Sequence, residues 1–280
     1  MEAACAGIPG TLVLLLFVDP FADLDPDLAA LRPLGGFFVL RTVRALVAGP
    51  DAARTDELTT LAKAYGELGP DGHGNALGTR VETVAGRLGT TEPRVAASIA
   101  HQALAARLWS VALGCAVRYG RLPDLDPGLL RWDPAATAPD DLRLTEVRAL
   151  PGGAGPAALA DTVVQAVVHG HLEPLGEALR ARYGVAAGLL WGNAGSALAG
   201  AARELGRWAR ANNRPDAAAR TRHLADTLFA HPLLSTTGTR TGPAFRRRSC
   251  CLYYRVPGGG VCGDCCFTQP PRSSPRAASG

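Results

Sequence analysis

Apolar side chains recur every three or four residues along most of the chain, the spacing that places them on one face of an α-helix. Turn residues, chiefly glycine and proline, separate these stretches. The predicted helices span residues 51–68, 75–88, 92–119, 156–168, 171–183, 186–212 and 215–230. The longest of them, 92–119, has Pro93 in its first turn and is rich in alanine, so its axis can approach a neighbouring helix closely. The pattern predicts a mainly α fold built on a multi-helix domain.

One part of the chain departs from this pattern. Residues 122–155 are interrupted by five prolines, and residues 142–147 alternate apolar and polar side chains, as half-exposed strands do. We expect a small β-hairpin insertion at about 130–150. Residues 231–243 are predicted to form a loop.

The strongest apolar run, Leu12–Val18, has seven residues, whereas a bilayer-spanning helix needs roughly 20. It is predicted to be a buried strand or short helix, and no stable membrane insertion is expected. No positive charge precedes the run, as a secretory signal would require. The expected location is the cytoplasm, where thiols stay reduced, so a group of cysteines favours metal or redox chemistry over disulfides.

Charge and cysteines coincide near the end of the sequence. The 280 residues have a net charge of +4 and include seven cysteines, five of them between Cys250 and Cys266. From Arg240 onward there are seven arginines and one acidic residue, so the rest of the chain is slightly acidic. The basic run Arg246–Arg248 is short and lacks interleaved aromatic residues, so no nucleic-acid partner is expected.

The five cysteines contain the spacing C-C-x10-C-x2-C, formed by Cys250, Cys251, Cys262 and Cys265. Four thiolates can saturate a metal centre, and Gly258–Gly260 lets the chain turn tightly around it. An iron–sulfur cluster would use all four, and nearby arginines would offset its negative charge. A structural zinc site usually has two C-x2–4-C pairs, which the doubled cysteine fits poorly. A redox pair of Cys262 and Cys265 would leave the other two idle.

This segment resembles the C-terminal signature of FhuF-type ferric-siderophore reductases. The resemblance rests on residues 247–255, 257–260 and 262–265, with further likeness in 98–109 and 190–196. It implies a [2Fe–2S] cluster held by Cys250, Cys251, Cys262 and Cys265. The family typically has another residue where this chain has Cys266, which is therefore a candidate substitute for Cys265.

The resemblance also implies an activity and a division of most of the chain. Residues 1–245 would form a helical siderophore-docking domain and 246–267 the cluster-binding segment. Residues 268–280 are rich in proline, serine and arginine and are expected to form a disordered tail. The expected activity is one-electron reduction of ferric iron in hydroxamate-type siderophores, which releases ferrous iron. The expected partners are the ferric siderophore and an electron donor such as a ferredoxin or flavoprotein. No catalytic side chain beyond the cluster is required.

Candidates for binding the siderophore are polar or aromatic residues among the apolar helices. They are His101, Arg107, Trp109, Trp191 and Asn193.

Two other functions remain open from the residues alone. The protein could be a [2Fe–2S] electron-transfer or iron-sensing protein without its own substrate. Less favoured is a zinc-stapled interaction protein.

Overall fold

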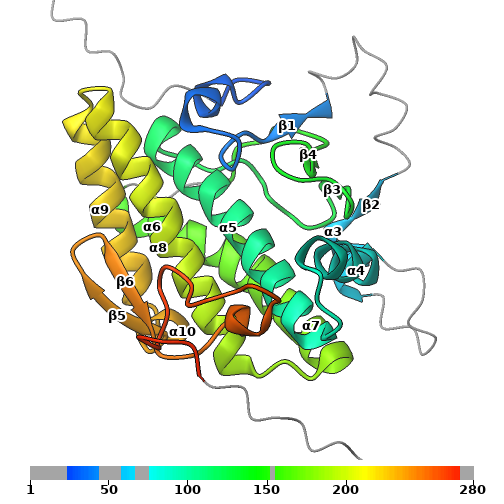
Figure 1. Cartoon of the computed structure of the whole chain (residues 1–280). Helices are drawn as coiled ribbons and strands as arrows, with labels where there is room; N and C mark the ends of the chain where they lie inside the picture. The colour runs from blue at the N-terminus through cyan, green and yellow to red at the C-terminus, as the bar shows by residue number, and fades with distance from the viewer. Residues whose placement is uncertain (1–23, 44–57, 67–75, 152–154, 272–280) are drawn as a thin grey trace, which may run out of the picture.

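The computed structural model describes residues 24–43, 58–66, 76–151 and 155–271. A central helix, α5 (Pro93–Tyr119), contacts most of the other described helices (Figure 1). It begins at Pro93, whose missing N–H costs nothing in the first turn, and ends at Gly120. Gly120 has the left-handed backbone (φ 69°) that this residue type tolerates, and its N–H bonds the Ala116 carbonyl. The predicted helix over 92–119 is confirmed.

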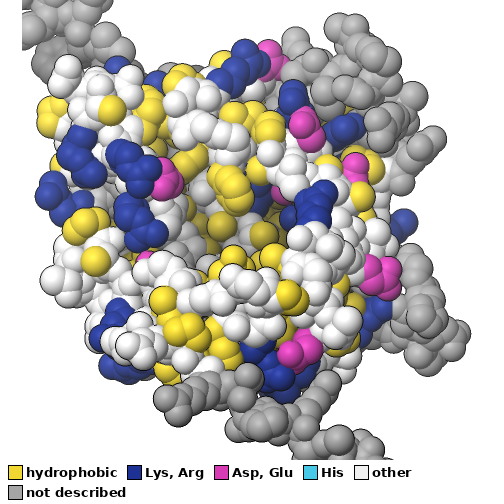
Figure 2. Space-filling view, in the orientation of Figure 1, with side chains coloured by type: hydrophobic (Ala, Val, Ile, Leu, Met, Phe, Trp, Pro, Cys, Tyr) yellow, Lys and Arg dark blue, Asp and Glu magenta, His cyan; other side chains and the backbone are white. Residues whose placement is uncertain are grey.

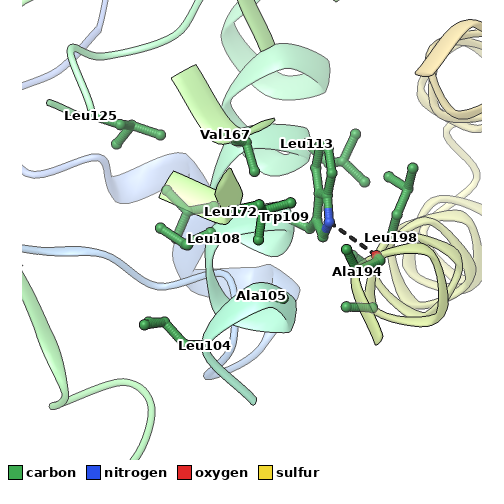
Figure 3. Close-up of a cluster of buried hydrophobic side chains, with 14 of the residues drawn as sticks. Leu104, Ala105, Leu108, Trp109, Leu113, Leu125, Val167, Leu172, Ala194 and Leu198 are labelled. Atoms are coloured by element: carbon green, nitrogen blue, oxygen red, sulfur yellow. Dashed lines mark hydrogen bonds between the residues drawn. The ribbon is translucent and has the colours of Figure 1, made fainter. Parts of the chain in front are cut away.

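The core lies between α5 and α8 (Ala187–Ala211). Small residues along both helices let their backbones approach, and the fully buried Trp109 donates its indole N–H to the Ala194 carbonyl at 3.1 Å (Figure 3). In Figure 1, α8 and α9 (Pro215–Phe229) lie on one side of α5, and α4 (Ala76–Leu88) lies on the other. The mainly α fold predicted from the periodicity is therefore observed.

The predicted helices 156–168 and 171–183 were expected to be separated by a turn at Gly170, and this prediction is wrong. Helix α6 (Pro156–Val163) continues through a π-helical stretch, η2 (Val164–Leu172), into α7 (Glu173–Tyr183). Pro174 explains the widened turns, because in a regular α-helix its ring would clash with the carbonyl four residues earlier. A single glycine costs a helix only about 1 kcal/mol, and burial of the neighbouring apolar side chains in η2 outweighs that cost.

The insertion is a hairpin of β3 (Leu130–Trp132) and β4 (Leu142–Leu144), as the alternation predicted, and two further strands extend it. The sheet order is β1-β4-β3-β2, in which β1 (Arg41–Thr42) runs parallel to β4 and β2 (Thr59–Thr60) antiparallel to β3. The predicted helix over 51–68 is therefore wrong at residues 59–60. Its helical part among the described residues is α3 (Leu61–Gly66).

The predicted loop over 231–243 is also wrong. It contains the short helix α10 (Pro232–Ser235) and strand β5 (Gly238–Thr241), which pairs with β6 (Ala244–Arg247). Phe245 of β6 is buried and lies 5.5 Å, centroid to centroid, from the ring of Phe229. Burial of this ring holds the hairpin against the helices, and the hairpin leads directly into the cysteine segment.

Some predictions fall outside the described residues. These are the element at Leu12–Val18 and most of the predicted disordered tail; residues 268–271 form neither helix nor strand. The 3₁₀ helix η1 (Ala29–Leu34) packs on α5. In the described ranges, no helix is both long enough and apolar enough to cross a bilayer.

Candidate metal centre

The cysteine segment lies across α5 and α8 (Figure 1). Ser98 of α5 donates its hydroxyl to the Cys251 carbonyl at 2.8 Å, and Asn193 of α8 donates to both the carbonyl and the hydroxyl of Ser98. Gly192 allows this approach, since a Cβ there would collide with the Ser249 hydroxyl. The segment is thus seated on two rigid helices.

Polar contacts at Asp264 and at Arg255 hold the segment on the helical body. Asp264 accepts a hydrogen bond from the Ser196 hydroxyl at 2.6 Å, and Arg203 lies 3.6 Å from its carboxylate. Arg255 pairs with Glu92, just before α5, at 2.6 Å. These contacts anchor the segment at Asp264, within the C-x2-C pair, and at Arg255, four residues after the Cys-Cys pair.

The thiols gather in pairs. Cys251 and Cys262 hydrogen-bond to each other through their side chains, and so do Cys265 and Cys266. Cys250 interacts electrostatically with Cys265 and Cys266. Among the described residues all cysteines are free thiols, and Cys251 is the most deeply buried of the five.

The four predicted ligands share one backbone feature. Each sulfur accepts a hydrogen bond from the N–H of the residue two positions later. Leu252 donates to Cys250 at 3.3 Å and Phe267 to Cys265 at 3.4 Å. The backbone of Tyr253 donates to Cys251, and that of Asp264 donates to Cys262.

A left-handed turn at Leu252 (φ 68°) directs the chain so that the first of these bonds forms. Cys266 does not share the pattern, since its backbone contact is with its own N–H. N–H···S bonds stabilise thiolates, and in this respect Cys265 differs from Cys266; the choice between them as ligand stays a prediction.

The charge state of the thiols follows the pairing. Donation from the Cys262 thiol lowers the pKa of Cys251 to about 7, while giving that hydrogen bond raises the pKa of Cys262. Burial raises the pKa of Cys250 and of Cys266. The Cys251–Cys262 pair can therefore share one proton, with the thiolate on Cys251.

The grouping of the thiols bears on the kind of metal centre they could hold. Over the described ranges, no group of three or more His, Cys, Asp and Glu side chains is placed as a ready metal site. A tetrahedral zinc site needs four ligands at one point. A [2Fe–2S] cluster would take two thiolates on each iron. Two groups of thiols fit that need: Cys251 pairs with Cys262, and Cys250 interacts with Cys265.

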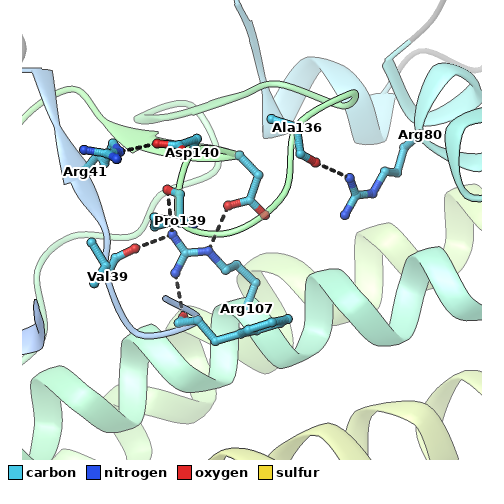
Figure 4. A network of polar contacts seen from close by, with 9 residues as sticks. Val39, Arg41, Arg80, Arg107, Ala136, Pro139 and Asp140 are labelled. Carbon is cyan, nitrogen blue, oxygen red and sulfur yellow. Dashed lines mark hydrogen bonds and ion pairs between the residues drawn. The ribbon is translucent and has the colours of Figure 1, made fainter. Parts of the chain in front are cut away.

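Arg107 and Trp109 lie inside the protein. The Arg107 guanidinium donates to the Asp141 carboxylate at 2.9 Å and to the carbonyls of Phe37, Val39 and Pro139 (Figure 4). It ties α5 to the N-terminal segment and to the insertion. The structure does not bring Arg107 or Trp109 to a surface where a ligand could reach them.

Asn193 is buried as well and acts on the cysteine segment, through its bonds to Ser98 and to Arg247. Sequence reasoning missed the hydroxyls of Ser98 and Ser196 as groups that hold the cysteine segment. Their signal was spacing, since Ser196 lies about one helical turn after the candidate Asn193, and Ser98 lies one turn before Gln102.

His101 and Trp191 lie together in a pocket of about 140 Å³ between α5, α7 and α8. Burial, with a smaller contribution from Arg247, lowers the pKa of His101 to about 3, so its ring is neutral. Its Nδ1 is buried without a hydrogen-bond partner in the described structure.

A second pocket, of about 280 Å³, lies between α4, α5 and the insertion. Ile99 and Ala103 of α5 form part of its lining, and Phe37 also lines it with 49% of its surface exposed. Its charged lining residues are Arg80, Arg87 and Asp141. Figure 2 shows hydrophobic side chains gathered in a hollow at the centre of the face that α5 crosses, above the cysteine segment.

Fold and site together define a helical protein with an appended iron–sulfur segment. Two family models match the chain: one described as ferric iron reductase FhuF-like transporter, over residues 130–244, and one described as FhuF 2Fe-2S C-terminal domain, over residues 247–267. The chain belongs to the FhuF-type family, and its cofactor is a [2Fe–2S] cluster. No curated protein matches it significantly.

Proposed function

We propose that the protein reduces ferric iron bound to hydroxamate-type siderophores in the cytoplasm, one electron at a time, and so releases ferrous iron. The observation that carries the proposal is the set of four cysteines, each with the same N–H···S bond, seated on the two central helices beside a hollow. Membership of a ferric iron reductase family supports the activity.

Cys250, Cys251, Cys262 and Cys265 would hold the cluster. When bound, the cluster supplies one electron to Fe³⁺ in the substrate and is reduced again by an external donor, a ferredoxin or flavoprotein. The backbone N–H groups would donate to the four sulfurs and help to orient them toward the cluster. Ser98 and Asn193 fix the segment on α5 and α8, so the distance between the cluster and a ligand on α5 does not vary.

We propose the 280 Å³ pocket as the docking site. It adjoins the segment along α5, because Ser98 bonds the segment and the next residue, Ile99, lines the pocket. Its volume is close to the lower limit for small-molecule sites. A large chelate could therefore place one part of itself in the pocket and leave the rest at the surface. The apolar lining suits the carbon chains between hydroxamate groups.

The activity is tested by mixing the reduced protein anaerobically with ferric hydroxamate chelates. We expect the visible spectrum of the cluster to return to its oxidised form while ferrous iron appears in a ferrous-chelator trap. If the cluster stays reduced and no ferrous iron is trapped, the reductase proposal is wrong. The electron-transfer or iron-sensing alternative would then be favoured.

A pair of matched alanines tests the docking site. Both Ala103 and Ala187 are half-buried helix residues, and each lines one of the two pockets. Ala103→Trp is expected to slow reoxidation at low chelate concentration by about tenfold or more, because the indole fills the proposed site; tenfold corresponds to ~1.4 kcal/mol. Ala187→Trp should change the rate by less than about twofold.

Reduction of both variants by dithionite serves as a control for the cluster itself. The opposite ranking would assign the siderophore to the pocket of His101 and Trp191, whose role in binding remains a prediction. Equal rates in the two variants would contradict docking in either pocket.

A further inference from the structure

Arg247 differs from the other arginines of the cysteine segment in its burial. It is the last residue of β6, where alternate side chains face opposite sides, so Phe245 and Arg247 point inward while Arg246 points to solvent. Arg247 is 2% exposed. Its side chain therefore lies in the interface between the segment and the two central helices.

The polar partners of Arg247 are all neutral. Its guanidinium donates to the Gln102 side-chain oxygen at 3.3 Å, to the Leu189 carbonyl at 3.4 Å and to the Asn193 side-chain oxygen. Its Nε has no acceptor. No ion pair joins it to any carboxylate among the described residues, and the carboxylate of Asp264 is engaged by Ser196 and Arg203.

Arg107 provides a comparison within the same protein. It is equally buried, yet Asp141 balances its charge at 2.9 Å. An unbalanced buried charge is strongly unfavourable. The protein therefore requires a negative partner for Arg247 that its carboxylates do not provide.

The hydrogen bonds of Arg247 lead to both parts of the cysteine motif. Its backbone N–H donates to the carbonyl of Asp264, between Cys262 and Cys265, at 2.9 Å. Asn193, which accepts from its guanidinium, donates to Ser98, and the Ser98 hydroxyl bonds the Cys251 carbonyl. The charge of Arg247 also interacts electrostatically with the thiols of the motif. The buried His101 ring also interacts with Arg247, but it stays neutral and supplies no negative charge.

We propose that Arg247 is the buried counter-cation of the [2Fe–2S] cluster and makes the cluster easier to reduce. A cluster with four thiolates has a charge of −2 when oxidised and −3 when reduced, so a fixed positive charge stabilises the reduced form more. Gln102 and Asn193 position the guanidinium without neutralising it. The inference rests on the proposed ligand set and concerns the potential of the cluster, independently of its substrate.

The test is a redox titration of the cluster-loaded protein, followed by visible and EPR spectra without siderophore. In Arg247→Gln the ratio of reduced to oxidised cluster at a fixed solution potential should fall by at least about tenfold, a shift of 59 mV for one electron. Arg247→Lys, which keeps the charge, should lie closer to the natural protein. The exposed arginines supply matched controls, and Arg246→Gln and Arg248→Gln should shift the potential much less.

Gln102→Glu tests the same idea with Arg247 in place. It adds a carboxylate of equal size within reach of the guanidinium and should lower the potential in the same direction. This variant decides the question if Arg247→Gln fails to retain the cluster. A potential in Gln102→Glu that stays within the shift of the two exposed controls overturns the proposal.

Because the titration contains no siderophore, it separates this inference from the reductase activity. A protein that fails to reduce ferric hydroxamates could still show the predicted shift, and the reverse also holds.

Discussion

Replacing Cys251 with serine is expected to abolish the visible spectrum of the [2Fe–2S] cluster. Cys251 is 2% exposed and paired with Cys262, so no solvent ligand can easily take its place. A serine hydroxyl is a harder and far less acidic donor than a thiol, and the loss of one thiolate leaves an iron with an incomplete coordination shell. Absorption spectra together with iron and acid-labile sulfide analysis measure the effect.

Two other cysteines supply the controls. Cys266→Ser should retain the cluster, because Cys266 lacks the N–H···S bond that the four proposed ligands share. Cys115→Ser should retain it as well, because Cys115 is buried in α5, outside the cysteine segment. An unchanged spectrum in Cys251→Ser would refute the ligand assignment, and loss of the cluster in Cys266→Ser would show that Cys266 replaces Cys265.

The second large effect is on stability. Asp141→Ala should lower the free energy of unfolding by about 3–5 kcal/mol, because it leaves Arg107 buried with an unbalanced charge. The side chains of this pair are 1% and 4% exposed, and three backbone carbonyls hold the guanidinium in place. Urea denaturation of the cluster-loaded protein, followed by circular dichroism, measures the loss.

An exposed ion pair provides the comparison. Glu204 pairs with Arg207 on the surface of α8 at 2.8 Å, with side chains 51% and 63% exposed. Glu204→Ala should cost no more than about 1 kcal/mol, since solvent screens the charges. Similar losses in the two variants would show that the Arg107–Asp141 pair does not hold the insertion and the N-terminal segment on α5.

Local patterns in the sequence predicted the helices well, because both their apolar periodicity and their end signals are local. The helix 92–119 is an example, with Pro93 at one end and Gly120 at the other. The pairing of Thr59 with Trp132 was not predictable in this way, since it joins residues far apart in the chain and overrides a helical pattern. Gly170 failed as a breaker for a related reason, because packing against α5 outweighs its low helix propensity.

The same distinction between local patterns and long-range packing applies to the candidate site. The cysteine spacing is local and predicted a metal-binding segment, and its resemblance to the family signature predicted the [2Fe–2S] cluster; the ligand set stays a prediction. The substrate candidates depended on which helix faces meet, and that is a property of the packing. His101 and Trp191 do share a pocket, whereas Arg107 and Trp109 are engaged by partners inside the core. The burial of Arg247 was equally hidden, since its two neighbours in the sequence are exposed arginines.

All four proposed ligands follow, in the order of synthesis, the two helices on which they are seated. A ribosome releases the chain from its N-terminus, so α5 and α8 exist in full before Cys250 is made. Only 16 residues separate the first proposed ligand from the last, counting both, so closing the segment around iron costs little chain entropy. Cluster loading can therefore be a late step, performed on a body of helices that already provides Ser98 and Asn193 as a template.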